Sequence, residues 1–231
     1  ELFFLQLDII RQGLSRKVST RGLPCPRIGQ KFNTFYFDHL PFPLTGAHKR
    51  VIHEIQDDMK GGLQMNRLLQ GDVGSGKTIV AALVALLAID NGFQACIMAP
   101  TEILAEQHYD SCKERFKNFP VKIERMSRFV SPAEQKKILT KLALGEVDIL
   151  VGTHRIIQKD VKFKNLGLMI IDEEQRFGVK DKEKLKEMKN NIDCLSMSAT
   201  PIPRTLHMSL LKIRDMSLLT TPPHNRQPVE T

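Results

Sequence analysis

The sequence predicts an α/β fold, in which a mostly parallel sheet carries helices on both of its faces. Short apolar runs that suit buried strands alternate along the chain with longer segments that suit helices. Most of these runs are apolar at nearly every position, as strands are when helices cover both faces of a sheet. The 231 residues are enough for one large domain with short flanking segments.

The expected elements follow one another in a regular order. The runs MNRLLQ, FQACIMAP, VKIERM, VDILVG, LGLMIID and DCLSMSA predict strands because they are short and mainly apolar. Helices are expected over residues 47–59, 77–90, 102–117, 131–144, 180–189 and 203–212. The segment 180–189 is strongly charged and is expected to be a solvated helix.

The segments outside this alternation are expected to flank the domain. Residues 1–13 suit an amphipathic helix at the tail of a preceding domain, and the start at Glu1 suggests a fragment of a longer protein. Residues 19–45 are rich in Pro, Gly, Thr and Phe and predict an irregular linker. We therefore expect one lobe over residues 46–220, preceded by a tail and linker over 1–45 and followed by a linker over 221–231.

An excess of basic residues points to a polyanionic partner. The chain has 34 Lys and Arg against 26 Asp and Glu, a formal charge of +8, and 19 basic and 12 acidic side chains lie in residues 111–190. Nucleic acid fits such a surface, and solubility alone is the alternative. The chain has no Trp and only two Tyr, so few side chains are available for stacking on bases.

The cysteines and the hydropathy pattern bear on the compartment. Cys25, Cys96, Cys112 and Cys194 have no spacing that suits a metal or a redox pair, and Cys96 and Cys194 lie in apolar runs that suit a core. Reduced thiols are expected in a cytoplasmic protein. No apolar run reaches about 18 residues, so no membrane span is predicted.

The stretch GDVGSGKT, residues 71–78, matches the phosphate-binding pattern G-x-x-x-x-G-K-[ST] between a predicted strand and a predicted helix. Its glycines allow backbone N–H groups to point at phosphate oxygens, and the following helix adds positive potential. Lys77 is expected to bridge the β- and γ-phosphates of ATP, and Thr78 to bind Mg²⁺. The predicted nucleotide-binding residues of this glycine loop are Gly71, Gly74, Ser75, Gly76, Lys77 and Thr78. An ordinary glycine-rich turn is the alternative.

A second candidate group follows the apolar run LMII. Asp172 is expected to hold Mg²⁺, commonly through water, and Glu173 to position or deprotonate the attacking water. Both carboxylates follow a predicted central strand, which in a parallel sheet brings them to the same edge as the glycine loop. Lys77, Asp172 and Glu173 are therefore the predicted catalytic residues, and a solvated acidic turn is the alternative.

The order of these motifs resembles the first motor lobe of superfamily 2 helicases. The glycine loop is followed by APTEILAEQH, GTHR, DEEQ and SATPIPRT. The resemblance implies a RecA-like P-loop NTPase lobe. Within the superfamily the chain resembles the branch that contains RecG and the transcription-repair coupling factor (Mfd). Its N-terminal half is more similar to RecG, and its C-terminal half is more similar to Mfd.

The resemblance also implies residues that contact DNA and residues that couple hydrolysis to movement. The expected contacts to the DNA backbone are Pro100, Thr101, Gly152, Thr153, His154, Arg155 and Arg204. The expected coupling residues are Gln175, Ser198 and Thr200. Hydroxyls, backbone N–H groups and Arg suit phosphate contacts, which position DNA without reading its sequence. Taken alone, Thr101 also suits the N-cap of a helix, and His154 a structural histidine.

One position departs from the pattern of the family. Helicases of this branch carry Gln in the segment LT-x-x-Q, where it contacts the adenine edge, and the corresponding residue here is His48 in LTGAHKRV. His48 is therefore the expected adenine-binding residue. Histidine does not form the same paired amide contact, which puts adenine selectivity in question.

The resemblance implies an ATP-dependent translocase or helicase that acts on double-stranded or branched DNA in repair or recombination. Expected partners are that DNA, a second RecA-like lobe of the same full-length chain and, for an Mfd-like protein, RNA polymerase. Because a second lobe would supply arginine fingers, we expect the isolated chain to be nearly inactive as an ATP hydrolase. The alternatives are a P-loop kinase or phosphotransferase and a non-catalytic nucleotide-binding module.

Overall fold

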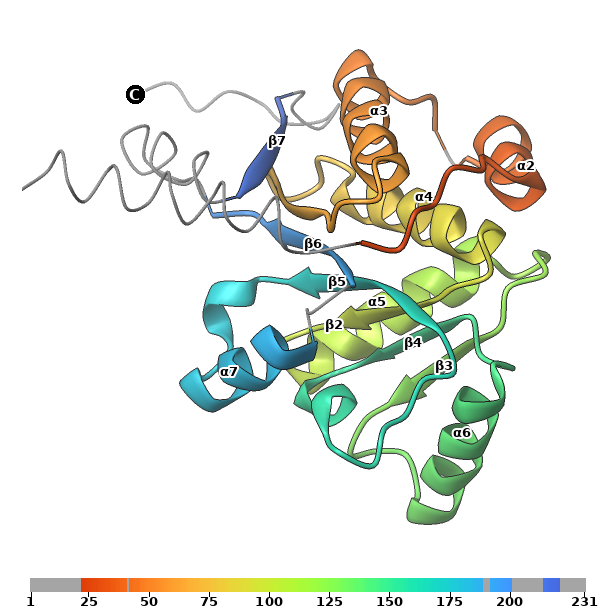
Figure 1. Ribbon diagram of the computed structural model, residues 1–231, viewed down its shortest axis with the longest axis vertical. Helices are drawn as coiled ribbons and strands as arrows, with labels where there is room; N and C mark the ends of the chain where they lie inside the picture. The colour runs from red at the N-terminus through yellow and green to blue at the C-terminus, as the bar shows by residue number, and fades with distance from the viewer. Residues whose placement is uncertain (1–21, 41, 189–191, 201–213, 221–231) are drawn as a thin grey trace, which may run out of the picture.

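The fold is a seven-stranded parallel sheet with helices on both faces (Figure 1). The computed structural model describes residues 22–40, 42–188, 192–200 and 214–220. The strands are β1 (Asn66–Gly71), β2 (Gln94–Met98), β3 (Ile123–Met126), β4 (Ile149–Gly152), β5 (Leu166–Asp172), β6 (Asp193–Ser198) and β7 (Asp215–Leu219). They lie in the order β3-β4-β2-β5-β6-β1-β7, and each hydrogen-bonded pair is parallel. The predicted fold class is confirmed.

Helices and short 3-10 turns connect these strands. They are α2 (Gln30–Asp38), α3 (Gly46–Lys60), α4 (Lys77–Asp90), α5 (Glu102–Arg115), α6 (Pro132–Leu144), η1 (His154–Ile157), η2 (Glu174–Arg176) and α7 (Val179–Met188). The predicted strands and helices within the described residues are present, with small shifts at their ends. The helices predicted over 1–13 and 203–212, and the linker predicted over 221–231, lie outside the described residues.

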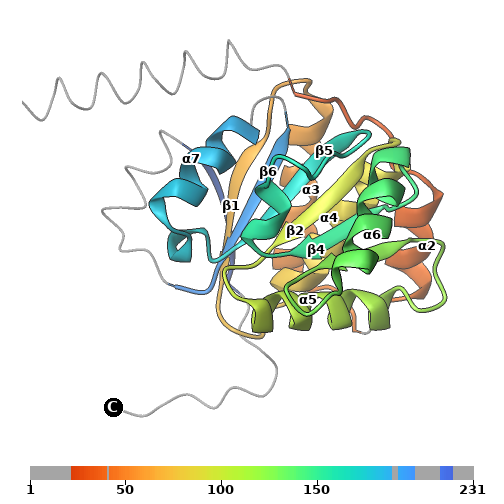
Figure 2. The same ribbon diagram turned by 90° about the horizontal axis from the view of Figure 1, so that it is seen from below.

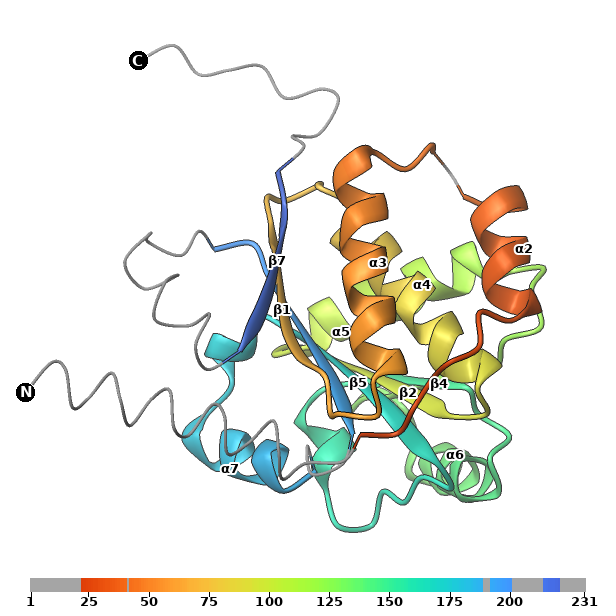
Figure 3. The same ribbon diagram turned by 45° about the horizontal axis from the view of Figure 1, so that its top comes forward.

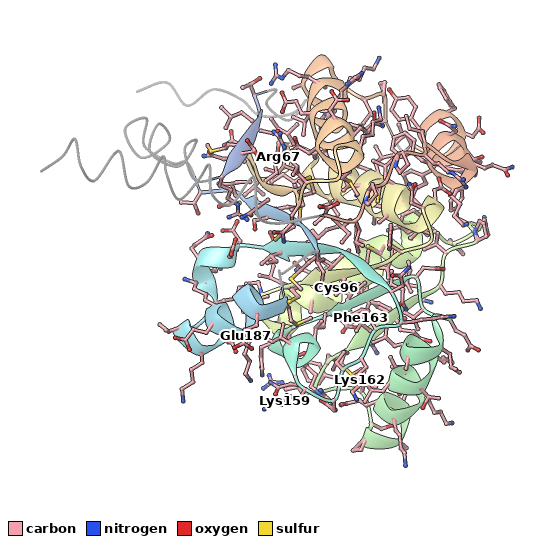
Figure 4. The ribbon with its side chains drawn as sticks, in the orientation of Figure 1. Arg67, Cys96, Lys159, Lys162, Phe163 and Glu187 are labelled. Carbon is pink, nitrogen blue, oxygen red and sulfur yellow. The ribbon has the colours of Figure 1, made fainter. Side chains whose placement is uncertain are left out.

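A hydrophobic core lies on each face of the sheet. Figure 3 shows α2, α3 and α4 on one side of the sheet and α6 and α7 on the other. Every side chain of α4 from Ile79 to Ile89 is buried, which explains why this helix is apolar all round. Cys96, at the centre of the sheet in Figure 4, belongs to one core and the next residue, Ile97, to the other. The strands therefore read as continuous apolar runs because both of their faces are buried.

The prediction of an irregular linker over residues 19–45 is wrong in part, because Gln30–Asp38 form the helix α2. Phe32 and Phe35 of this helix are buried in the same core as α4. A carboxylate oxygen of Asp90, at the end of α4, accepts a hydrogen bond of 2.9 Å from the backbone N–H of Phe32. Contacts with α4 thus hold α2 in place, and a local sequence pattern does not reveal such contacts.

The edge strand β7 is a second element that the sequence analysis did not predict. It pairs with β1, and a buried arginine joins the two strands to α3. Arg67 of β1 donates to the carboxylate of Asp58 at 2.7 Å and to the hydroxyl of Ser217 at 2.9 Å. Figure 4 shows Arg67 beside β7. Ser217 can be buried in this strand because the arginine satisfies its hydroxyl.

Cys96 and Cys194 lie in the core, as their apolar runs predict. All four cysteines are buried and form no disulfide. Across the described residues, no helix combines the length and the apolar character that crossing a membrane requires.

Candidate functional site

The predicted functional residues gather at one edge of the sheet, where the strands end at their carboxyl termini. Figure 2 shows the central strands side by side in one layer. β6 lies between β1 and β5, so the loop after β6 stands between the glycine loop and the acidic residues that follow β5. The loops after β2 and β4 come next along the same edge. The topology thus brings together motifs that are widely separated in the sequence.

The glycine loop has the backbone that its sequence predicts. Gly74 and Gly76 have φ values of 80° and 88°, a region that favours glycine. A Cβ atom on Gly71 would lie 2.5 Å from the hydroxyl oxygen of Ser75, so the backbone is also closely packed there. The Ser75 hydroxyl is buried and has no hydrogen-bond partner among the described residues. A buried, unsatisfied hydroxyl within a loop of this kind fits an anionic ligand such as a phosphate group.

Lys77 lies at the start of α4 and folds back over the loop. Its ammonium group donates to the backbone oxygens of Gly71 at 2.6 Å and Asp72 at 2.8 Å. Burial lowers the pKa of Lys77, while the negative charges of Asp172 and Glu173 act in the opposite direction. Lys77 therefore lies within electrostatic range of both predicted acidic residues.

Asp172 ends β5, and its carboxylate has a partner that the sequence analysis missed. The Nε2 atom of His108 lies 2.8 Å from Oδ2 of Asp172, and only 13% and 14% of the two side chains is exposed. His108 belongs to α5 and to the motif APTEILAEQH, but no sequence signal places it over the end of β5. Thr78, the other predicted magnesium ligand, is half-buried in the first turn of α4.

Glu173 has an unusual backbone conformation. With φ at 46°, it is the one non-glycine residue with a positive φ among the described residues. Its side chain accepts hydrogen bonds from the Ala199 backbone N–H at 2.8 Å and from the Ser198 hydroxyl at 3.3 Å. Strained residues held by several contacts are common at functional sites. The end of β6 therefore fixes the carboxylate of Glu173.

The three predicted coupling residues form a continuous set of contacts with Glu173. The amide nitrogen of Gln175 donates to the Glu173 carboxylate, and it lies 3.4 Å from the hydroxyl oxygen of Ser198. The backbone N–H of Thr200 donates to the same hydroxyl at 3.2 Å. The acidic residues after β5 are therefore joined by hydrogen bonds to Ser198, Ala199 and Thr200 at the end of β6.

A surface hollow of about 520 Å³ brings together most of the predicted DNA-contacting residues. Its lining residues are Pro100, Thr101, Glu102, Ser127, Arg128, Gln135, Thr153, His154 and Arg155. Ser127 and Arg128 follow β3 at the same edge of the sheet, so the strand-end argument could have found them. Gly152 is buried at the end of β4 instead of lining the hollow, and Arg204 lies outside the described residues.

Two threonines that line this hollow form hydrogen bonds within the protein. The hydroxyl of Thr101 accepts a hydrogen bond of 3.3 Å from the Leu104 backbone N–H and caps α5, so the N-cap interpretation of Thr101 is confirmed. Thr153 is buried, and its hydroxyl donates to Oε1 of Glu102 at 3.2 Å. Thr101 remains exposed, so capping does not remove it from the surface.

Among the basic side chains that line the hollow, one is held in an ion pair and two are exposed. Arg155 forms a two-point ion pair with Asp160, with nitrogen–oxygen distances of 2.8 and 2.6 Å. These hydrogen bonds hold the pKa of Asp160 below its usual range. Arg128 and His154 are exposed, and the Arg128 guanidinium lies 5.3 Å from the centre of the Phe129 ring. Arg128 therefore adds a basic group that the sequence analysis did not single out.

His48 lies against the glycine loop and is 4% exposed. Its Nε2 atom is 2.8 Å from the backbone oxygen of Ser75, and its Nδ1 atom is 2.7 Å from the hydroxyl oxygen of Thr45. Both ring nitrogens thus have partners within the protein. His48, the predicted adenine-binding residue, therefore connects the glycine loop to the residue before α3.

Comparisons with known proteins agree with this arrangement. Residues 45–209 match the sequence profile of the family described as DEAD/DEAH box helicase. The chain is 50% identical over 216 residues to the transcription-repair-coupling factor of Borreliella burgdorferi, and 52% identical over 198 residues to that of Staphylococcus aureus. These alignments cover 94% and 86% of this chain but 19% and 17% of the relatives, so the chain spans less than a fifth of their length.

Solved structures give the same result. The chain is similar to a structure of RecG bound to a three-way DNA junction, with a TM-score of 0.84 and 41% sequence identity. That similarity covers 98% of this chain and 30% of the RecG chain. A DEAD box protein from Methanococcus jannaschii matches with a TM-score of 0.53 and 25% identity, over 77% of this chain and 54% of its own.

Proposed function

Since this chain belongs to the DEAD/DEAH box helicase family, we propose that it is the ATP-binding motor lobe of an ATP-dependent DNA translocase or helicase. Its similarity to both Mfd and RecG assigns it to their branch of superfamily 2. One observation carries the proposal. The glycine loop, the acidic residues after β5 and the loop after β6 meet at a single sheet edge, beside a hollow that contains a basic side chain.

The glycine loop would hold the phosphates of ATP. The unsatisfied hydroxyl of Ser75 and the open backbone at Gly74 and Gly76 support this role. The ammonium group of Lys77 would turn from its backbone partners to the phosphate oxygens. The hydroxyl of Thr78 and the carboxylate of Asp172 would hold Mg²⁺, which would offset the negative charge of the phosphates.

Glu173 would act as the general base. One carboxylate oxygen accepts the Ala199 N–H, which orients the group toward the edge of the sheet. The other oxygen lies near the Ser198 hydroxyl and the Gln175 amide. A carboxylate held in this way can position a water molecule and accept its proton as the water attacks. Gln175 would then report a change at Glu173 to Ser198, and thus to the backbone of Thr200.

The surface hollow would contact the phosphate backbone of double-stranded or branched DNA. Exposed Arg128, His154 and Thr101 can donate hydrogen bonds to phosphate oxygens. These donors do not distinguish one base from another, which suits a motor that moves along any sequence. The structure of the similar RecG protein is bound to a DNA junction, which supports a DNA partner for this chain.

The rest of the motor would come from sequence beyond this lobe. We infer a lobe over residues 46–220 that pairs with a second RecA-like lobe of the same full-length chain, with residues 221–231 as the linker between them. Arginine fingers from a second lobe can raise hydrolysis by about 10³–10⁵-fold, so the isolated chain would turn over ATP very slowly. RNA polymerase would be a further partner if the full-length protein acts as its Mfd relatives do.

ATP turnover by the full-length protein, with and without duplex DNA, tests the proposal. We expect DNA to stimulate turnover, and the substitution Lys77→Ala to remove both nucleotide binding and turnover. Lys49→Ala, which removes an exposed lysine from α3, is the matched control and should change neither. A rate of ATP turnover that is the same with and without DNA would favour a phosphotransferase. Nucleotide binding that is unchanged in Lys77→Ala would exclude the glycine loop as the nucleotide site.

A further inference from the structure

We propose that His48 is a positioning residue that holds the glycine loop through the backbone of Ser75 and does not read the nucleobase. The site would then accept nucleoside triphosphates without distinguishing adenine from guanine at this position. The inference rests on the proposed nucleotide-binding function of the glycine loop. It replaces the adenine contact that the sequence predicts for His48.

The partners of the imidazole determine its tautomer. Nδ1 lies 3.3 Å from the backbone nitrogen of Thr45, which can only donate, so Nδ1 is the acceptor. Nε2 lies 2.8 Å from the backbone oxygen of Ser75, which can only accept, so Nε2 carries the proton. His48 uses both nitrogens to join the start of α3 to the glycine loop.

The hydrogen bond to Ser75 orients the next peptide group of the loop. In a trans peptide the C=O and the following N–H point in opposite directions. When the Ser75 carbonyl points at His48, the N–H of Gly76 points away from the His48 ring. Backbone N–H groups on that side are the donors that a phosphate-binding loop offers. His48 thus orients a donor of the loop without contacting the ligand.

The close packing at Gly76 shows how directly the ring supports the loop. A Cβ atom on Gly76 would lie 2.4 Å from Nε2 of His48, so no larger residue fits while the ring is in place. The ring of Phe42 lies 6.3 Å from the His48 ring and covers it further. With 4% of His48 exposed and both nitrogens bonded, a nucleobase has no free polar atom of this residue to contact.

The geometry also explains how glutamine could replace histidine here. His48 is the third residue of α3, and with Thr45 it forms a capping box. The amide oxygen of a glutamine could accept from the Thr45 N–H, while its NH₂ group donates to the Ser75 carbonyl. His48→Gln is therefore a conservative variant that should keep the contact. His48→Ala removes it.

Nucleotide binding to the wild type, His48→Gln and His48→Ala tests the inference. Dissociation constants would be measured for fluorescent ATP and GTP analogues at one Mg²⁺ concentration, with thermal unfolding as a check of the fold. We expect His48→Ala to weaken both nucleotides by the same factor of about five, the effect of one lost hydrogen bond. We expect His48→Gln to restore the affinity for ATP, and the ATP-to-GTP ratio to be equal in the wild type and His48→Ala.

The outcomes separate this inference from the proposed function. A loss of ATP affinity alone in His48→Ala would show that His48 reads adenine, and unchanged affinity for both nucleotides would exclude a positioning role. Nucleotide binding that survives Lys77→Ala would overturn the proposed function itself.

The proton position on the His48 ring can also be measured in the wild-type protein. The ¹⁵N shifts of the His48 imidazole, assigned by their loss in His48→Gln, should show a proton on Nε2. A ring without a proton on Nε2 would overturn the inference.

Discussion

The backbone N–H of Ala199 donates a hydrogen bond to the Glu173 carboxylate at 2.8 Å. This contact joins the residue after β5 to the residue after β6, which are neighbouring strands. The donor is a backbone group, so the orientation of the carboxylate does not depend on the charge of a neighbouring side chain. The same contact remains possible when the carboxylate is replaced by an amide of the same shape.

Glu173→Gln should therefore separate binding from hydrolysis. The amide oxygen of glutamine can still accept the Ala199 N–H, but the side chain can no longer accept a proton from water. We expect nucleotide affinity near the wild-type value and hydrolysis about 10²–10⁴-fold slower, measured in single turnovers of the full-length protein. Glu146→Gln, at an exposed position before β4, is the control. Normal hydrolysis by Glu173→Gln would show that another group is the base.

His108 should affect nucleotide binding only through Mg²⁺. His108→Ala removes the partner of the Asp172 carboxylate, whereas His108→Gln keeps an N–H donor of similar length. Loss of a residue that orients a metal ligand commonly costs 10-fold or more in metal affinity. We expect about 10-fold weaker binding of a fluorescent ATP analogue to His108→Ala with Mg²⁺, and little change with EDTA. Equal affinity of the alanine and wild-type proteins in Mg²⁺ would contradict a positioning role.

Releasing Arg155 from its ion pair should strengthen DNA binding. Asp160→Asn removes the charge that holds the Arg155 guanidinium, which then becomes available to phosphate oxygens. We expect higher affinity for duplex DNA by fluorescence anisotropy, and a slope of log affinity against log salt that is steeper by about one.

Glu146→Gln makes the same change in net charge at the opposite edge of the sheet and serves as the control. Equal gains from the two substitutions would assign the effect to net charge instead of to Arg155.

The buried carboxyl of Asp193 should make the stability of the fold depend on pH. Burial raises the pKa of Asp193 to about 7; a hydrogen bond from the Met65 N–H opposes this shift, and the charge of Asp58 adds to it. Between about pH 4 and pH 7 the folded chain keeps this proton while the unfolded chain has lost it, so stability falls as the pH rises through this window.

Asp193→Asn removes the ionisation and should flatten this dependence. We expect urea unfolding to show similar stability for the two proteins at about pH 4, and a variant more stable by roughly 2–4 kcal/mol at pH 8. A variant that is less stable than the wild type at pH 8 would contradict the assignment.

The motifs at strand ends could be predicted from the sequence because their positions follow from one rule. In a parallel sheet every strand ends at the same edge, so residues after apolar runs must gather there. This rule brought Lys77, Asp172, Glu173 and Ser198 together before any contact was known. It also applies to Ser127 and Arg128, which follow a shorter and more polar strand and were not singled out.

The remaining features depend on contacts between distant parts of the chain. Gln30–Asp38 form a helix because Asp90 caps them and α4 buries their phenylalanines. The buried Ser217 of β7 depends on Arg67, and Asp172 meets a histidine 64 residues away in the sequence. His48 was assigned by its position in a motif, whereas its contacts depend on where α3 packs. No local pattern contains such information.

The position of β1 in the sheet determines when the strand before the glycine loop acquires its neighbours. Asn66 of β1 pairs with Cys194 of β6, and Arg67 pairs with Asp215 of β7. Contacts across such long stretches of chain form slowly, because the loop must close before they stabilise it. On the ribosome the glycine loop emerges before β6 and β7, so its strand acquires both neighbours only after residue 219 has left the exit tunnel. Nascent chains that stall before that point would therefore carry the glycine loop without the two strands that flank β1.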